Sequence, residues 1–194
     1  MRKIMLFVAG LLTLLAGSQA APINGNYVTE VTGAELIGRA SPSPFVAVVT
    51  TQNKAIAYLC DGDFLAEWFR ADLQPGGLFE ARSTSKKSGI TAQINAGSVV
   101  GAITLESGKT IQFRATPADG TAGLYRSDDN IDNQRFLGGW VVLPNGEQRG
   151  AVIGGGSTRP GQKLEFRTGF VSVSLSDLGL LQPFQVTPEF LTKP

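Results

Sequence analysis

The chain has 194 residues, of which 42% are hydrophobic and 17% charged, and it contains 24 glycines, one cysteine and no histidine. This composition excludes a disordered or collagen-like chain and indicates a folded domain. The net charge is +1, and removing Arg2 and Lys3 leaves 15 basic against 16 acidic residues, a net charge of −1. A near-neutral chain gives no electrostatic reason to expect nucleic acid as a partner.

Residues 1–20 have the pattern of a secretory signal peptide. Arg2 and Lys3 supply the positive start, residues 4–16 the apolar run, and Ser18-Gln19-Ala20 the small-residue exit. The apolar run is shorter than the roughly 20 residues that a membrane crossing needs. We expect cleavage before Ala21, no transmembrane segment afterwards, and a secreted or periplasmic product.

Residues 21–44 are expected to form an N-terminal strand and a Ser/Pro loop. Residues 27–31 are rich in β-branched side chains and predict the strand, whereas the Ser-Pro-Ser-Pro run before residue 45 disfavours both helix and ladder pairing. Residues 45–51 and 55–59 then predict a hairpin. The pattern of residues 64–69 fits either a strand or one helical turn.

Residues 45–176 are predicted to form the all-β domain. Apolar runs at 78–83, 90–94, 98–105 and 110–113 are separated by turn residues at intervals of about ten residues. The fold class we predict is all-β, an antiparallel meander that forms a small barrel or sandwich. Short helical turns are expected at most near the C-terminus.

Residues 138–152 contain the clearest hairpin, two strands around Asn145-Gly146, because both residues tolerate the positive φ that a two-residue loop requires. Residues 101–109 match residues 139–147 in Gly, Leu and turn-Gly positions. We read that match as convergence on a hairpin template in preference to an internal duplication.

Residues 154–161, which begin Gly-Gly-Gly, are expected to be a flexible connection. They lack the spacing of a phosphate-binding loop. Residues 177–194 form an apolar tail that we expect to pack on the domain, with Pro188 at the start of a last helical turn.

The absence of histidine removes the usual general base, the commonest metal ligand and the ordinary catalytic triads. No catalytic residue, metal or cofactor is therefore assigned from the sequence. Cys60 is interpreted as a small buried hydrophobe, with a reactive thiol or an intermolecular bridge as the alternative. Asp61, Asp63 and Glu67 are the candidates for a carboxylate-based site beside aromatic side chains.

Asp128, Asn130 and Asp132 are the candidates for a cation site, because they alternate as the oxygen ligands of a calcium loop do. Asn133 stands where the sharp-turn Gly of such a loop belongs, and Gly139 stands where the bidentate Glu belongs. A solvated polar loop is the interpretation that we favour.

Three segments carry a resemblance to known sequences: residues 57–62 (AYLCDG) with Trp68 downstream, residues 122–126 (AGLYR) and residues 138–148 (GGWVVLPNGEQ). The series is similar to one in secreted bacterial proteins of uncharacterised function, which share AYxCDG…W, AGLYR and GGWxVLPxGxQ segments. The similarity covers residues 45–152. It carries no assigned chemistry and implies no catalytic roles.

The function predicted from the sequence is that of a secreted or periplasmic, non-catalytic binding or envelope-interaction domain. Its partner would be a small molecule, a glycan or an envelope protein, with Tyr58, Trp68, Tyr125 and Trp140 as candidate ligand-binding residues and the protein core as their default role. The alternative is a carboxylate-based hydrolase acting on glycans or cell-envelope material.

Overall fold

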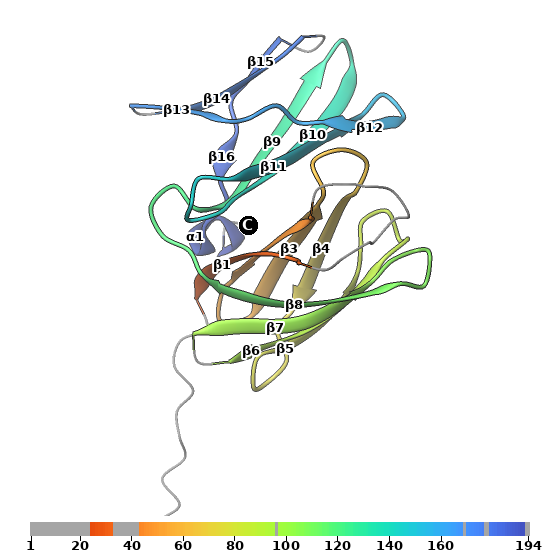
Figure 1. Cartoon of the computed structure of the whole chain (residues 1–194), viewed down its shortest axis with the longest axis vertical. Coiled ribbons are helices and arrows are strands. Elements are labelled where there is room, and N and C mark those ends of the chain that lie inside the picture. The colour runs from red at the N-terminus through yellow and green to blue at the C-terminus, as the bar shows by residue number, and fades with distance from the viewer. Residues whose placement is uncertain (1–23, 33–42, 96, 169, 177–178, 193–194) are drawn as a thin grey trace, which may run out of the picture.

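The computed structural model describes residues 24–32, 43–95, 97–168, 170–176 and 179–192. The expected signal peptide and most of the Ser/Pro loop lie outside these residues. The described chain is almost entirely antiparallel β-structure, as the alternation of apolar runs and turn residues predicts (Figure 1).

The first sheet has eight strands that follow one another as hairpins and curl into a nearly closed barrel. Its hydrogen-bonded order is β4-β3-β2-β1-β8-β7-β6-β5, and an isolated bridge between Phe69 and Ser83 brings the two edge strands together. The strands are β1 (Gly25–Glu30), β2 (Phe45–Thr50), β3 (Lys54–Cys60), β4 (Ala66–Asp72), β5 (Leu78–Arg82), β6 (Gly89–Asn95), β7 (Ser98–Thr104) and β8 (Thr110–Pro117).

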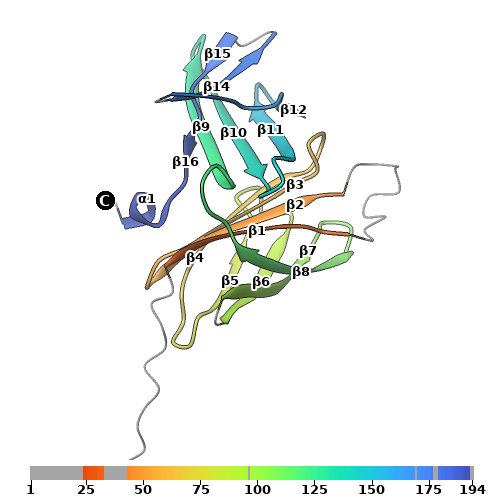
Figure 2. The same cartoon turned by 60° about the vertical axis from the view of Figure 1, so that its left-hand side comes forward.

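Two smaller sheets follow along the chain and stack on one side of the barrel (Figures 1 and 2). The second sheet has the order β12-β11-β10-β9-β16, and the third sheet has the order β13-β14-β15. The strands are β9 (Gly123–Ile131), β10 (Gln134–Val142), β11 (Gln148–Gly154), β12 (Ser157–Pro160), β13 (Glu165–Arg167), β14 (Phe170–Leu175), β15 (Gly179–Leu181) and β16 (Phe184–Gln185), and the chain continues into the helix α1 (Pro188–Thr192).

These layers enclose three apolar cores. The barrel interior is filled by inward-facing side chains such as Val46, Leu59 and Phe113. Because successive residues of a strand face opposite sides, β2 and β3 also present an outward apolar face, which packs on the second sheet. The far face of the second sheet is in turn covered by the third sheet. All six residues of β2 are therefore buried.

The hairpin at 138–152 forms as predicted, with β10 paired to β11, but its loop is wider than a two-residue turn. The amide of Gly146 donates to the carbonyl of Leu143 at 2.9 Å, and the amide of Leu143 donates to the carbonyl of Glu147 at 2.9 Å. Gly146 has φ +83°, whereas Asn145 is not among the residues with positive φ. The geometry is a turn closed by a glycine bulge, in which only one residue needs the left-handed conformation.

The matched segment at 101–109 makes the same loop. Gly108 has φ +80°, and its amide donates to the carbonyl of Leu105 at 2.9 Å. Shared turn residues therefore produce a shared turn geometry, which agrees with convergence on one template.

The prediction of a flexible connection at 154–161 is wrong. Gly155 and Gly156 have φ of +59° and +78° and form a tight turn, after which Ser157–Pro160 pairs with β11 as the edge strand β12. Two consecutive residues that adopt positive φ at little cost favour a hairpin over a linker. The alternative left open at 64–69 resolves as a strand, since residues from Ala66 onward pair with β3.

The described part of the C-terminal tail packs on the domain only in part, because Leu180 and Phe184 are 63% and 40% exposed. Leu181 reaches the core beneath the third sheet, and Val186 and Leu191 reach the core between the barrel and the second sheet. Pro188 begins α1, the short helix predicted there. Within the described residues, no helix has the length and apolar character to cross a bilayer.

Candidate functional site

The segments that carry the sequence resemblance meet at the contact between the barrel and the second sheet. The rings of Tyr58 on β3 and Trp68 on β4 lie 4.3 Å apart between centroids, and the Tyr58 hydroxyl donates to the carbonyl of Gly139 on β10 at 3.3 Å. Arg126 on β9 lies over the Trp68 ring at 5.3 Å. Burial raises the pKa of Tyr58 well above its usual value. The segments therefore build a shared core.

The other two candidate aromatic residues lie in a different core, between the second and third sheets. The indole N–H of Trp140 donates to the carbonyl of Gln162 at 2.9 Å, and the hydroxyl of Tyr125 donates to the carbonyl of Thr121 at 2.9 Å. The four aromatic side chains are at most 3% exposed. The structure thus places them in the packing of the protein, in two separate groups, as the default role of core residues anticipated.

The candidate carboxylates have structural partners. One carboxylate oxygen of Asp61, which is 1% exposed, accepts hydrogen bonds from the amides of Asp63, Phe64 and Leu65 at 2.8–3.0 Å. Asp61 therefore organises the β3–β4 turn. Glu67 accepts a hydrogen bond from the Ser85 hydroxyl at 2.7 Å, where β4 meets the chain that follows β5. The two carboxylates serve different parts of the fold.

The candidate cation ligands lie on the β9–β10 hairpin. Arg126 and Arg135 each reach Asp128 at 2.7 Å. The pKa of Asp128 is held well below its usual range, chiefly by the hydrogen bonds from Arg135 and to a smaller extent by the one from Arg126. Asp132 and Asn133 have φ of 51° and 62° and form a two-residue turn. Across the described ranges, the side chains form no group of three His, Cys, Asp or Glu residues suited to a metal ion.

Cys60 is fully buried at the end of β3, as interpreted from the sequence. Desolvation raises the pKa of its thiol to about 12, so the thiol is neutral at ordinary pH. Because the thiolate is the nucleophilic form, this environment favours an inert side chain.

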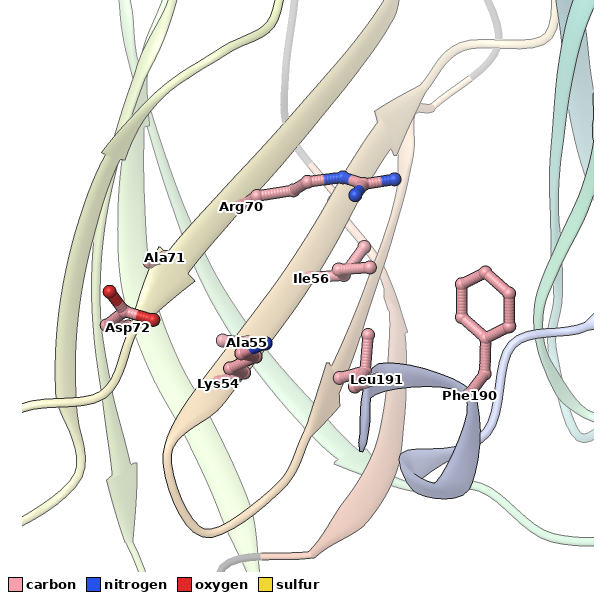
Figure 3. Close-up of a pocket in the computed structure, with 8 residues that line it drawn as sticks. All are labelled: Lys54, Ala55, Ile56, Arg70, Ala71, Asp72, Phe190 and Leu191. Atoms are coloured by element: carbon pink, nitrogen blue, oxygen red, sulfur yellow. The ribbon is translucent and has the colours of Figure 1, made fainter. Parts of the chain in front are cut away.

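An open groove lies elsewhere on the barrel, between the outer face of β3 and β4 and the helix α1 (Figure 3). Its volume is about 490 Å³. The lining residues come from these three elements: Lys54, Ala55, Ile56, Arg70, Ala71, Asp72, Phe190 and Leu191. The outward positions of β4 pass from buried Trp68 to exposed Arg70 and Asp72, so the groove begins where the packing against the second sheet ends.

Charged side chains gather near one end of the groove. Trp68 and Arg70 face the same side of β4, and Arg126 stacks over Trp68. The pKa of Arg70 is lowered because its side chain is partly desolvated and because Arg126 and Arg135 lie nearby. Asp128, which pairs with Arg126 and Arg135, acts in the opposite direction on this pKa.

The sequence-based candidates did not include the groove residues. Ile56, Arg70 and Phe190 are separated by up to 134 positions and meet only after the tail folds back on the barrel. The alternation Trp68-Arg70-Asp72 was the available signal, because it marks a strand face that changes from covered to exposed. No protein-family model, curated protein or solved structure matches this chain.

Proposed function

We propose that this chain is a non-catalytic binding protein that takes a small ligand in the groove between β3, β4 and α1. We further propose that it acts outside the cytoplasm, secreted or in the periplasm. The support for this location is the signal-peptide pattern of residues 1–20 and the resemblance of residues 45–152 to secreted bacterial proteins.

The observation that carries the proposal is the groove itself. Its volume of about 490 Å³ lies within the range typical of small-molecule sites. Ile56 and Leu191 form a nearly buried apolar floor, while Lys54, Arg70 and Asp72 supply charged groups at its margins. Polar and apolar groups share the exposed lining about equally, and the charged groups can orient a ligand.

The hydrolase alternative has less support. Asp61 accepts hydrogen bonds from three amides of a turn, and Glu67 accepts one from the Ser85 hydroxyl. Both carboxylates therefore have structural roles. Neither residue lines the groove. An envelope-interaction role remains compatible with the proposal if the groove takes a component of the envelope.

The proposal is tested by native mass spectrometry of the protein purified from its own host. We expect a co-purified small molecule that is retained by the wild type and lost in Phe190→Ala, which removes one wall of the groove. Phe64→Ala is the matched control, because Phe64 is 58% exposed and does not line the groove. A wild type that carries no small molecule, or a molecule retained equally by both variants, would contradict the proposal.

A further inference from the structure

The chain has few side chains that oxidants attack. Sulfur occurs only in Met1, Met5 and Cys60, and the sequence contains no histidine. Both methionines lie in the expected signal peptide, so Cys60 carries the single sulfur atom from residue 21 onward. The other readily oxidised side chains are the rings of two tryptophans and three tyrosines. Six side chains therefore decide how the exported chain reacts with oxidants.

The fold places these six side chains in its three apolar cores. The most accessible of them is 8% exposed, and Cys60 is fully buried. By contrast, the large apolar side chains that the described residues expose are four phenylalanines and one leucine, hydrocarbons that offer an oxidant neither sulfur nor an indole or phenol ring. The six buried residues are Tyr27, Tyr58, Cys60, Trp68, Tyr125 and Trp140.

Cys60 lacks both the access and the chemical form that a reaction with peroxide requires. In that reaction a thiolate attacks one peroxide oxygen, the O–O bond breaks, hydroxide leaves and a sulfenic acid forms. The sulfur of Cys60 instead accepts a hydrogen bond from the amide of Gly62 at 3.2 Å. Its burial also keeps the thiol protonated, so the nucleophilic thiolate is not formed.

We propose that the folded chain from residue 21 onward resists oxygen addition by hydrogen peroxide and hypochlorite, because every sulfur, indole and phenol group that it carries is buried. This property goes beyond the proposed binding function and does not depend on the groove. It suits a location outside the cytoplasm, because the thiol reductants that keep cytoplasmic proteins reduced do not act there.

The test treats the purified protein with millimolar hydrogen peroxide, once in the native state and once in urea. Peptide mass spectrometry then locates each added oxygen atom, so that Met1 and Met5 are read separately in a product that retains them. We expect Cys60 to stay unmodified in the native protein and to gain oxygen in urea, because unfolding exposes the thiol. Oxygen addition at Cys60 in the native protein would overturn the inference.

Two methionine variants test whether burial is the cause of the resistance. Phe64→Met places a thioether at an exposed turn position, whereas Leu124→Met places one in the core between the barrel and the second sheet. The thioether takes one oxygen atom from peroxide, and water is released. We expect Phe64→Met to form the sulfoxide at least about tenfold faster than Leu124→Met, because the buried sulfur reacts only after local opening. Equal rates in folded variants, as checked by circular dichroism, would show that burial does not protect.

Hypochlorite extends the test to the indole rings. Because lysine amines also react with hypochlorite, by chlorination, the quantity to follow is oxygen addition at the tryptophan-containing peptides. Phe64→Trp supplies an exposed indole as a control within the same molecule. We expect the new indole at position 64 to be oxidised while Trp68 and Trp140 stay unmodified. Oxidation of all three indoles to the same extent in the folded protein would contradict the proposal.

Discussion

At the scale of single residues, the contact between the barrel and the second sheet depends on a missing side chain at Gly139. A Cβ atom at this position would lie 2.6 Å from ring atoms of both Trp68 and Tyr58. Both rings are buried and stacked on each other, so they have little freedom to move away. Gly139 is therefore required by packing, without any need for positive φ.

We predict that Gly139→Ala lowers the free energy of unfolding by about 1–3 kcal/mol, the usual cost of overfilling a packed core. Gly89→Ala is the control, because a Cβ at Gly89 would meet its nearest atom at 3.8 Å, an ordinary contact. Its stability should stay within about 0.5 kcal/mol of the wild type. Urea denaturation of the three proteins measures the difference, and equal midpoints would contradict the packing argument.

At the scale of elements, the hairpin of β9 and β10 shows how one polar sequence supports two interpretations. Asp132 alternates with Asp128 and Asn130 as calcium ligands would, yet Asp132 and its neighbour Asn133 have positive φ and form the turn. Asp128 is drawn into ion pairs with Arg126 on its own strand and Arg135 on the next. Which interpretation holds depends on backbone conformation, which composition does not determine.

We predict that Asn133→Val lowers the free energy of unfolding by about 1–2 kcal/mol, because a β-branched residue is strained at a φ of 62°. Asn133→Gly should retain or raise stability, since Gly favours this turn position. Thermal unfolding followed by circular dichroism gives the comparison. Millimolar Ca²⁺ should leave the wild-type midpoint unchanged, and a rise of several degrees would restore the calcium-loop interpretation.

At the scale of the whole molecule, the second sheet joins the parts because it is buried on both faces. Val141 and Leu124 face the barrel, whereas Trp140 and Tyr125 face the third sheet. Separating the sheet from the barrel would expose large apolar surfaces on both, at roughly 25 cal/mol per Å². Separation of the second sheet from the barrel would therefore also expose the apolar outer face of β2 and β3.

We predict that the described chain unfolds in one cooperative transition. Tryptophan fluorescence reports on Trp68 in one core and Trp140 in another, and far-ultraviolet circular dichroism reports on all strands. The curves from both methods should coincide along a denaturant series. A first transition confined to one probe would instead indicate that the barrel and the stacked sheets are independent units.

The sequence by itself determined the class of the fold and much of its local structure. Alternating apolar residues and glycine-containing turns act over a few positions, so most strands of the barrel, the hairpin at residues 138–152 and the helix at Pro188 were predictable. It also placed Cys60 correctly in the interior. Local pattern was less informative at Asn145 and at Gly155-Gly156, because several loop geometries suit the same turn residues.

Only the tertiary structure decided which strands are covered on both faces and where that cover ends. Trp68 and Arg70 lie on the same face of β4. The five-stranded sheet covers Trp68 but leaves Arg70 exposed. Phe190 reaches the groove from the far end of the chain. Such contacts join segments separated by more than a hundred residues, and no periodicity in the sequence specifies which apolar face will meet which.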